Sequence, residues 1–142
     1  MSRVVTGLVL ILAGGLIAVV PQFILPVCES AVATASGGSV PMKCFWTARA
    51  ELGTGALIVF GGLLLCVCKD AGTRFGAAAV TAAAALLAVA FPTVLIGVCG
   101  SETMACRMGT LPALVLLGAF AFLVSLLACR SSARAAKKEG RR

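Results

Sequence analysis

The sequence contains no histidine and no tyrosine, and only 12% of its 142 residues are charged. The few charges stand at the ends of long apolar segments, none of which contains Lys, Arg, Asp or Glu. Membrane pumps and proton-coupled carriers use ionisable residues within their spans, so this absence argues against both classes. A Ser or Cys nucleophile in these segments would have no base beside it, which argues against an intramembrane hydrolase. We therefore predict no catalytic residues, no bound metal and no cofactor.

Apolar residues make up 61% of the chain, and its mean hydropathy is +1.10. Crossing a bilayer takes about 20 apolar residues, and continuous rather than alternating runs indicate helices. The shortest run, between Glu51 and Lys69, needs local thinning of the bilayer or snorkelling of those side chains. Pro92 is expected to kink the third helix. We predict an all-α integral membrane protein with a single domain, residues 1–142, and four transmembrane helices at residues 4–25, 52–68, 75–98 and 110–129.

The distribution of the 12 Lys and Arg residues predicts the orientation. Cytoplasmic segments of membrane proteins are enriched in Lys and Arg. With both termini in the cytoplasm, only Lys43, Arg49 and Arg107 lie outside, so we expect a multi-pass cell-membrane protein with a basic cytoplasmic tail at residues 131–142. The net charge of +7 then reflects topology and attraction to anionic lipids rather than nucleic acid binding. A signal peptide cleaved near Ala31-Val32-Ala33 is an alternative, although the apolar run is longer than usual for one.

The two halves of the chain repeat one order of features. Each half has an apolar run, a Cys, a polar segment with Met-x-Cys, a Thr or Gly-Thr, and a second apolar run that ends in Cys and a basic residue. Because both halves run in the same order, we predict two parallel repeats, residues 4–69 and 75–130, each forming a helical hairpin. The corresponding residues are Cys28, Met42-Lys43-Cys44 and Cys68-Lys69 in the first half, and Cys99, Met104-Ala105-Cys106 and Cys129-Arg130 in the second.

Four cysteines are expected on the outer side, where an oxidising environment favours disulfides. They are Cys28, Cys44, Cys99 and Cys106. Four cysteines allow three pairings. The repeat favours the two local bonds, Cys28–Cys44 and Cys99–Cys106, because each hairpin is then self-contained, and pairing between the hairpins is the alternative.

Three further cysteines, Cys66, Cys68 and Cys129, are expected at the inner ends of helices as reduced packing residues. Palmitoylation beside Lys69 or Arg130 is the alternative for them. The two Met-x-Cys pairs suit Cu(I), but disulfides would consume their thiols, so we predict no metal site.

Residues 42–51 are the outer segment with the most unusual composition, and they contain the single tryptophan, Trp46. Its ordinary role is that of an anchor at the level of the lipid head groups. Thr47 is expected to cap the second helix, and Arg49 and Glu51 to form a surface ion pair that adds little stability. We predict four candidate recognition residues, Phe45, Trp46, Arg49 and Glu51.

The segment Met42-Lys-Cys-Phe-Trp-Thr-Ala-Arg-Ala-Glu51 resembles a motif of a bacterial family of small four-span membrane proteins of unknown function. Members of that family carry a Cys, then Met-x-Cys-His-(Trp/Tyr)-Thr-x-x-Ala-Glu, then a second Cys pair around Met-x-Cys. Phe45 stands where the family often has His, so a metal or haem role for that position does not carry over. The resemblance implies no activity, and association with an ABC-type exporter is an expectation only. The matching residues are Cys28, Cys44, Trp46, Thr47, Ala50, Glu51, Cys99, Met104 and Cys106.

Small residues fill the predicted helices, as at Gly14-Gly15, Gly61-Gly62 and residues 82–85. In lipid they allow close packing of helices, either within the chain or against another protein. We therefore expect a non-enzymatic accessory or interaction subunit with a disulfide-braced outer cap, whose partners are membrane lipids and another membrane protein, such as a transporter, or a second copy. The alternative is a quinone-linked thiol–disulfide oxidoreductase. Such enzymes normally present a Cys-x-x-Cys pair, which this chain lacks.

Overall fold

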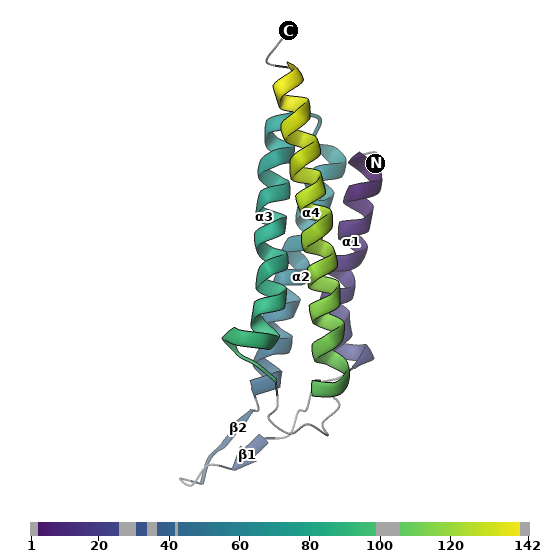
Figure 1. The fold of residues 1–142 in the computed structure, drawn as a ribbon. Coiled ribbons are helices and arrows are strands. Elements are labelled where there is room, and N and C mark those ends of the chain that lie inside the picture. The colour runs from purple at the N-terminus through teal and green to yellow at the C-terminus, as the bar shows by residue number, and fades with distance from the viewer. Residues whose placement is uncertain (1–2, 26–30, 34–36, 42, 99–105, 140–142) are drawn as a thin grey trace.

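The computed structural model describes residues 3–25, 31–33, 37–41, 43–98 and 106–139. This part of the chain forms four long helices and, between the first two, a short antiparallel β-hairpin that was not expected from the sequence (Figure 1). The helices are α1 (Arg3–Val19), α2 (Lys43–Val67), α3 (Ala71–Ala90) and α4 (Leu111–Glu139). Three π turns adjoin them, η1 (Val20–Ile24), η2 (Phe91–Leu95) and η3 (Cys106–Thr110), and the hairpin consists of β1 (Ala31–Ala33) and β2 (Ser39–Pro41).

The predicted four-helix membrane architecture is confirmed. Four helical segments of the described chain are long and apolar enough to cross a bilayer: Arg3–Ile24, Lys43–Val67, Ala71–Leu95 and Cys106–Lys138. The largest boundary differences are that α2 begins at Lys43 rather than at residue 52, and that α4 continues past Cys129 to Glu139. Helix α3 also begins earlier, at Ala71 rather than at residue 75. Ala, Lys and Arg are good helix formers, so the basic segment extends α4 beyond its apolar run.

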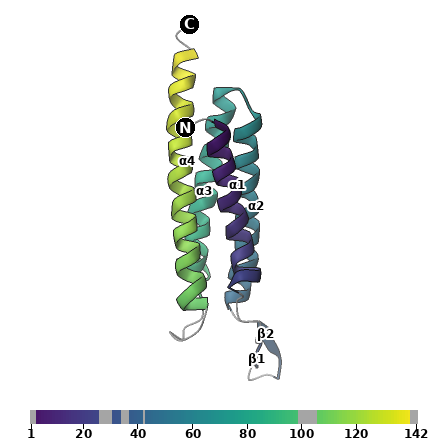
Figure 2. The ribbon, with the colours of Figure 1, turned by 90° about the vertical axis from the view of Figure 1, so that its right-hand side faces the viewer.

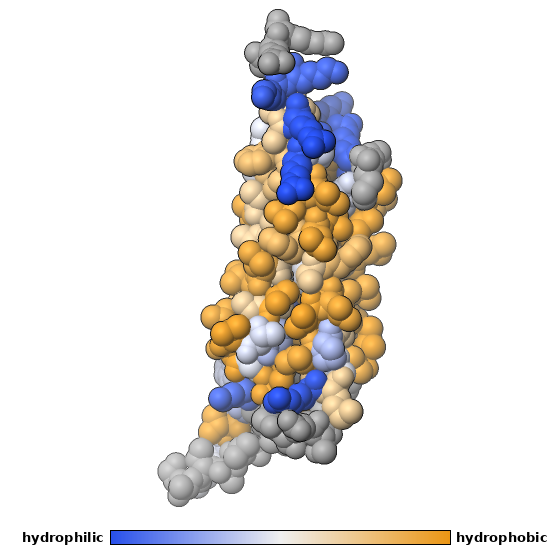
Figure 3. Space-filling view, in the orientation of Figure 1, coloured by the Kyte–Doolittle hydropathy of each residue, from blue (hydrophilic) through white to orange (hydrophobic). Residues whose placement is uncertain are grey.

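The bundle has two distinct ends. The two termini lie at one end, which we call the termini end, and β1 and β2 lie at the other, which we call the hairpin end (Figures 1 and 2). On the face shown in Figure 3, apolar side chains cover the middle of the bundle, and hydrophilic ones gather near its ends. Contacts are most extensive between α1 and α2 and between α3 and α4, and contacts of α2 with α3 and of α1 with α4 complete the ring. Two helical hairpins therefore pack side by side.

Four glycines let α1 and α2 approach closely. A Cβ added to Gly14 would lie 2.8 Å from the carbonyl oxygen of Gly55, and one added to Gly55 would lie 2.6 Å from the carbonyl oxygen of Gly14. Gly7 and Gly62 make a second reciprocal contact of this kind, at 2.7 and 2.8 Å. The two pairs are one heptad apart on both helices, so they lie on one face of each. The first hairpin thus uses small residues for close helix packing in lipid.

Helices α1 and α3 each end in a π turn that contains a buried proline, Pro21 in η1 and Pro92 in η2. Proline has no N–H to donate to the helix. In the wider π turn, a later N–H donates to a carbonyl five residues before it. In η1 the Leu25 N–H donates to the carbonyl of Val20 at 2.8 Å, and η2 has the equivalent bond at 3.1 Å. Pro92, where we predicted a kink, therefore lies in a turn that ends the helix.

Asp70 caps α3, and its pKa gives a testable pH dependence. Its Oδ2 accepts hydrogen bonds from the backbone N–H of Thr73 at 2.7 Å and from the Thr73 hydroxyl at 2.8 Å. These bonds lower the pKa of Asp70 below its ordinary value of 3.8. A carboxylate with a lowered folded-state pKa stabilises the fold fully above the unfolded pKa, and this contribution is lost as the pH falls through the folded pKa.

We expect Asp70→Ala to lower the Tm at neutral pH, and Asp70→Asn, which keeps an accepting oxygen, to lower it less. As the pH falls below about 4, the wild-type Tm should approach that of Asp70→Ala. Thermal unfolding of the full chain in detergent across this pH range measures both effects. An equal loss for Ala and Asn at neutral pH would show that Asp70 does not act as a cap.

Candidate functional site

Glu51 lies inside the bundle, which overturns two predictions about it. Because α2 begins at Lys43, Glu51 is about two turns into the helix and is 0% exposed. It therefore belongs to the second membrane span rather than to the outer boundary of that span. The predicted surface ion pair with Arg49 is also wrong, since residues two apart on a helix point to different faces and Arg49 is exposed.

The Glu51 carboxyl has one hydrogen bond within its own helix. The Thr54 hydroxyl donates to Glu51 Oε2 at 3.2 Å. Oε1 is buried and has no hydrogen-bond partner among the described residues. An ionisable residue within a membrane span is expensive to bury and is a candidate functional group by default. The prediction that the spans contain no ionisable residue is therefore wrong at Glu51.

Glu51 belongs to a row of buried side chains on one face of α2, of which one is a cysteine and the others are polar. The row is spaced at three and four residues, the period of a single helix face. It consists of Cys44, Thr47, Glu51 and Thr54, all of them buried.

Two threonines tie the halves of the bundle together at the hairpin end. The hydroxyl of Thr47, on α2, donates to the carbonyl of Gly97, just after η2, at 2.7 Å. The hydroxyl of Thr110, the last residue of η3, donates to the carbonyl of Leu25, just after η1, at 3.0 Å. Each half therefore bonds to the end of the first helix of the other half. We call these two bonds the threonine exchange.

The threonine exchange corrects the predicted role of Thr47. Thr47 does not cap α2, because the helix begins one turn earlier, at Lys43. Two features of the sequence point to these matching positions. One is a Thr shortly after each Met-x-Cys, and the other is the pair of matching prolines, Pro21 and Pro92. Spacing alone could not show that these hydroxyls bond across the repeat. A further bond, from the Gln22 side-chain amide to the Ala48 carbonyl at 3.1 Å, joins α1 to α2 at this end.

The predicted disulfides are not supported by the structure, since no two of the cysteines it describes are bonded. Cys28 and Cys99 lie outside the described residues, and each predicted bond has one of them as a partner. Cys44 and Cys106 are both fully buried at the hairpin end. Cys66, Cys68 and Cys129, which were predicted at the inner ends of helices, are half-buried thiols without a disulfide.

Three of the four predicted recognition residues form one exposed cluster at the start of α2. The Phe45 and Trp46 rings pack edge to face, with centroids 5.7 Å apart and planes at 85°. The Arg49 guanidinium carbon lies 5.2 Å from the centroid of the Phe45 ring, a cation–π contact. Trp46 remains 55% exposed. This aromatic cluster is separate from Glu51, which faces the interior.

The described residues contain no group of three or more His, Cys, Asp or Glu side chains that could hold a metal ion. The hairpin end therefore offers two features: an interior joined by hydroxyl-to-carbonyl hydrogen bonds, and a surface aromatic cluster. These features suit the positioning of helices and recognition of another molecule.

Comparisons with curated proteins and with solved structures found no significant match. A match to a family described as a domain of unknown function, DUF4418, covers residues 10–131. This span includes all of α2 and α3 and both threonines of the threonine exchange. The resemblance to a small family of unknown function is thereby confirmed: the chain belongs to the DUF4418 family.

Proposed function

We propose that this protein is a non-enzymatic membrane subunit that associates with a helix of another membrane protein or of a second copy. The observation that carries the proposal is an exposed strip of small residues on α3, which we call the small-residue face. Its members recur at intervals of four, three and four residues, as on one side of a helix. They are Gly72, Gly76, Ala79 and Ala83, all exposed.

Gly76 is an open glycine on this face, as Gly15 is on α1 and Gly53 on α2. Gly7, Gly14, Gly55 and Gly62 are each explained by close approach of the neighbouring backbone. A Cβ added to Gly76, in contrast, would meet no atom within 4 Å. A glycine in a helix costs about 0.5–1 kcal/mol relative to alanine, which nothing within this chain offsets at Gly76. Close approach of a partner helix would give this glycine the same role as the buried ones.

The aromatic cluster of Phe45, Trp46 and Arg49 supports recognition at the hairpin end. The Phe45 ring contacts both Trp46 and Arg49, so the three side chains present one aromatic and basic surface to a partner. The threonine exchange also favours two related hairpins, as parallel repeats would have. Because the termini end carries most of the described Lys and Arg residues, we place both termini in the cytoplasm and the aromatic cluster outside a cell membrane.

An oxidoreductase is the weaker interpretation. Thiol–disulfide exchange requires access of an attacking thiolate to the disulfide. Cys44 and Cys106, the described members of the predicted outer pairs, are 0% exposed. Their burial favours a structural role, and local disulfides with Cys28 and Cys99 are part of the proposal as a brace of the outer cap.

We expect Gly76→Leu to reduce association at least about tenfold while leaving the fold intact. The new side chain projects from an open position, so it blocks a partner without disturbing the bundle. Quantitative pull-down from membranes in mild detergent, together with crosslinking of tagged and untagged copies, measures association, and thermal unfolding measures stability.

Ala119→Leu is the matched control, because it adds the same kind of bulk to an exposed small residue of α4. The proposal requires that only Gly76→Leu loses a partner that wild type retains. Equal recovery from both variants would exclude the small-residue face as the interface.

A further inference from the structure

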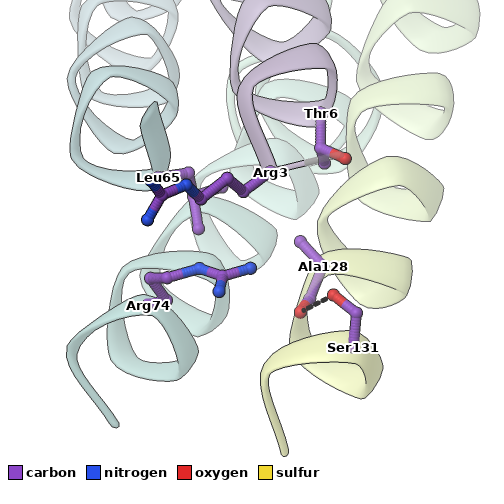
Figure 4. A pocket seen from close by; sticks show the side chains of 6 residues that line it. All are labelled: Arg3, Thr6, Leu65, Arg74, Ala128 and Ser131. Atoms are coloured by element: carbon purple, nitrogen blue, oxygen red, sulfur yellow. Dashed lines mark hydrogen bonds between the residues drawn. The ribbon is translucent and has the colours of Figure 1, made fainter. Parts of the chain in front are cut away.

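A cleft opens at the termini end, where α1, α3 and α4 meet the end of α2. It is lined by side chains from all four helices (Figure 4). Arg3 comes from the first residue of α1, and Arg74 reaches from the first turns of α3 toward α4 (Figure 4). The Arg3 side chain extends past Leu65, away from α4, so the two arginines line the cleft from different helices (Figure 4). The lining residues are Arg3, Thr6, Leu65, Arg74, Ala128 and Ser131.

The two arginines have no acidic partner in the described part of the chain. The Nε of Arg74 is buried without a hydrogen-bond partner, an expensive state for a charged group. Asp70, the nearest acid along the chain, uses its Oδ2 for Thr73 instead. The N-terminal ends of α1 and α3 lie here too, and their positive dipole ends outnumber the negative one at the C-terminal end of α2. An anion at the mouth of the cleft would give the two positive charges a counter-charge.

An apolar groove continues from the cleft along α1 and α4. It holds a cavity of about 200 Å³, lined by Thr6, Val124, Leu127 and Ser131. Thr6 and Ser131 also line the arginine cleft, so the two spaces are contiguous. Leu127 is 54% exposed on the membrane-facing surface, so the groove opens toward lipid. The arginine cleft itself has room for about 10 Å³, which places a bound phosphate at its mouth rather than inside.

We propose that this site binds an anionic phospholipid, with its phosphate at the mouth of the cleft beside Arg3 and Arg74 and an acyl chain in the groove beside Val124 and Leu127. Charge at one end and an apolar channel at the other match the two parts of a phospholipid. Basic pockets between transmembrane helices are used in this way for anionic head groups. The planar fork of arginine also suits two-point contact with phosphate oxygens.

Native mass spectrometry of the full chain in detergent, titrated with short-chain phosphatidylglycerol, tests the proposal. Phosphatidylcholine with the same acyl chains should bind at least about tenfold more weakly. The double variant Arg3→Gln/Arg74→Gln should also bind phosphatidylglycerol at least about tenfold more weakly. A loss of this size is expected when one or more charge-assisted hydrogen bonds are removed. Arg74→Lys, which keeps the charge but not the fork, should bind between wild type and Arg74→Gln.

Arg130→Gln/Arg134→Gln is the matched control, because it removes two exposed charges from the same end without touching the cleft. It should change the affinity by less than about threefold, since exposed charges contribute little. Equal losses of affinity in the two double variants would show that the lipid is held by diffuse electrostatic attraction to this end of the bundle, and would overturn the proposal. Equal binding of the two lipids would overturn it as well. Displacement of the lipid by inorganic phosphate at equal concentration would identify a free-anion site instead of a lipid site.

Discussion

Replacing Gly55 with leucine is expected to destabilise the bundle by about 3 kcal/mol or more, the upper range for overpacking a tight contact. A Cβ at this position would lie 2.6 Å from the Gly14 carbonyl oxygen and 2.9 Å from the Ala18 backbone nitrogen. Both are backbone atoms of α1, so they cannot move aside without separating the two helices. Reversible unfolding of the purified chain in a detergent or SDS titration measures the loss.

Gly53 provides the control for this prediction, because it lies on the same helix and has no neighbour within 4 Å. Gly53→Leu should leave the free energy of unfolding unchanged or raise it by up to about 1 kcal/mol, since leucine is the better helix former. A similar loss at both positions would mean that glycine contributes through helix flexibility rather than through close packing of α1 on α2.

Replacing Glu51 with lysine is expected to be nearly as damaging, at about 3–5 kcal/mol, the cost of an uncompensated buried charge. The described residues place no acidic group beside Glu51, so a lysine there would have no anion to pair with. Glu51→Gln should change the free energy of unfolding by only about 1 kcal/mol, because its side-chain carbonyl can still accept from Thr54. Thermal unfolding in detergent distinguishes the two outcomes.

Arg49→Gln serves as the reference for the Glu51 variants, since Arg49 is exposed two residues away. A surface change of this kind should alter stability by about 0.5 kcal/mol or less. If Glu51→Lys were as mild as Arg49→Gln, residue 51 would have access to water, and its burial in the bundle would be contradicted.

Sequence patterns were sufficient for the features that depend on local composition. Four uncharged apolar runs predicted four spanning helices, because a bilayer requires both length and hydropathy. The residues at which these helices begin and end could not be predicted from hydropathy, since helix formation does not stop where apolar residues stop. The segment 43–51 is helical although it contains Lys43, Arg49 and Glu51, and α4 continues to Glu139. For the same reason, Glu51 was assigned to the surface from its charge alone.

The candidate site depended on contacts between residues far apart in the chain. The aromatic cluster was predictable because Phe45, Trp46 and Arg49 are neighbours on one helix. The threonine exchange joins residues 50 and 85 positions apart, and the cleft at the termini end combines Arg3 with Arg74. No periodicity encodes such pairs, since they arise only when two hairpins pack against each other.

By itself, the sequence determined that this chain is a four-helix membrane protein with two similar halves, because hydropathy, span length and repeated motifs are local properties. Only the tertiary structure decided that Glu51 faces the interior, that Thr47 and Thr110 bond across the halves, and that Gly76 remains uncovered. The physical reason is that lipid does not drive apolar faces together. Close glycine contacts and buried hydrogen bonds therefore choose which face of each helix turns inward, and these contacts exist only in the assembled bundle.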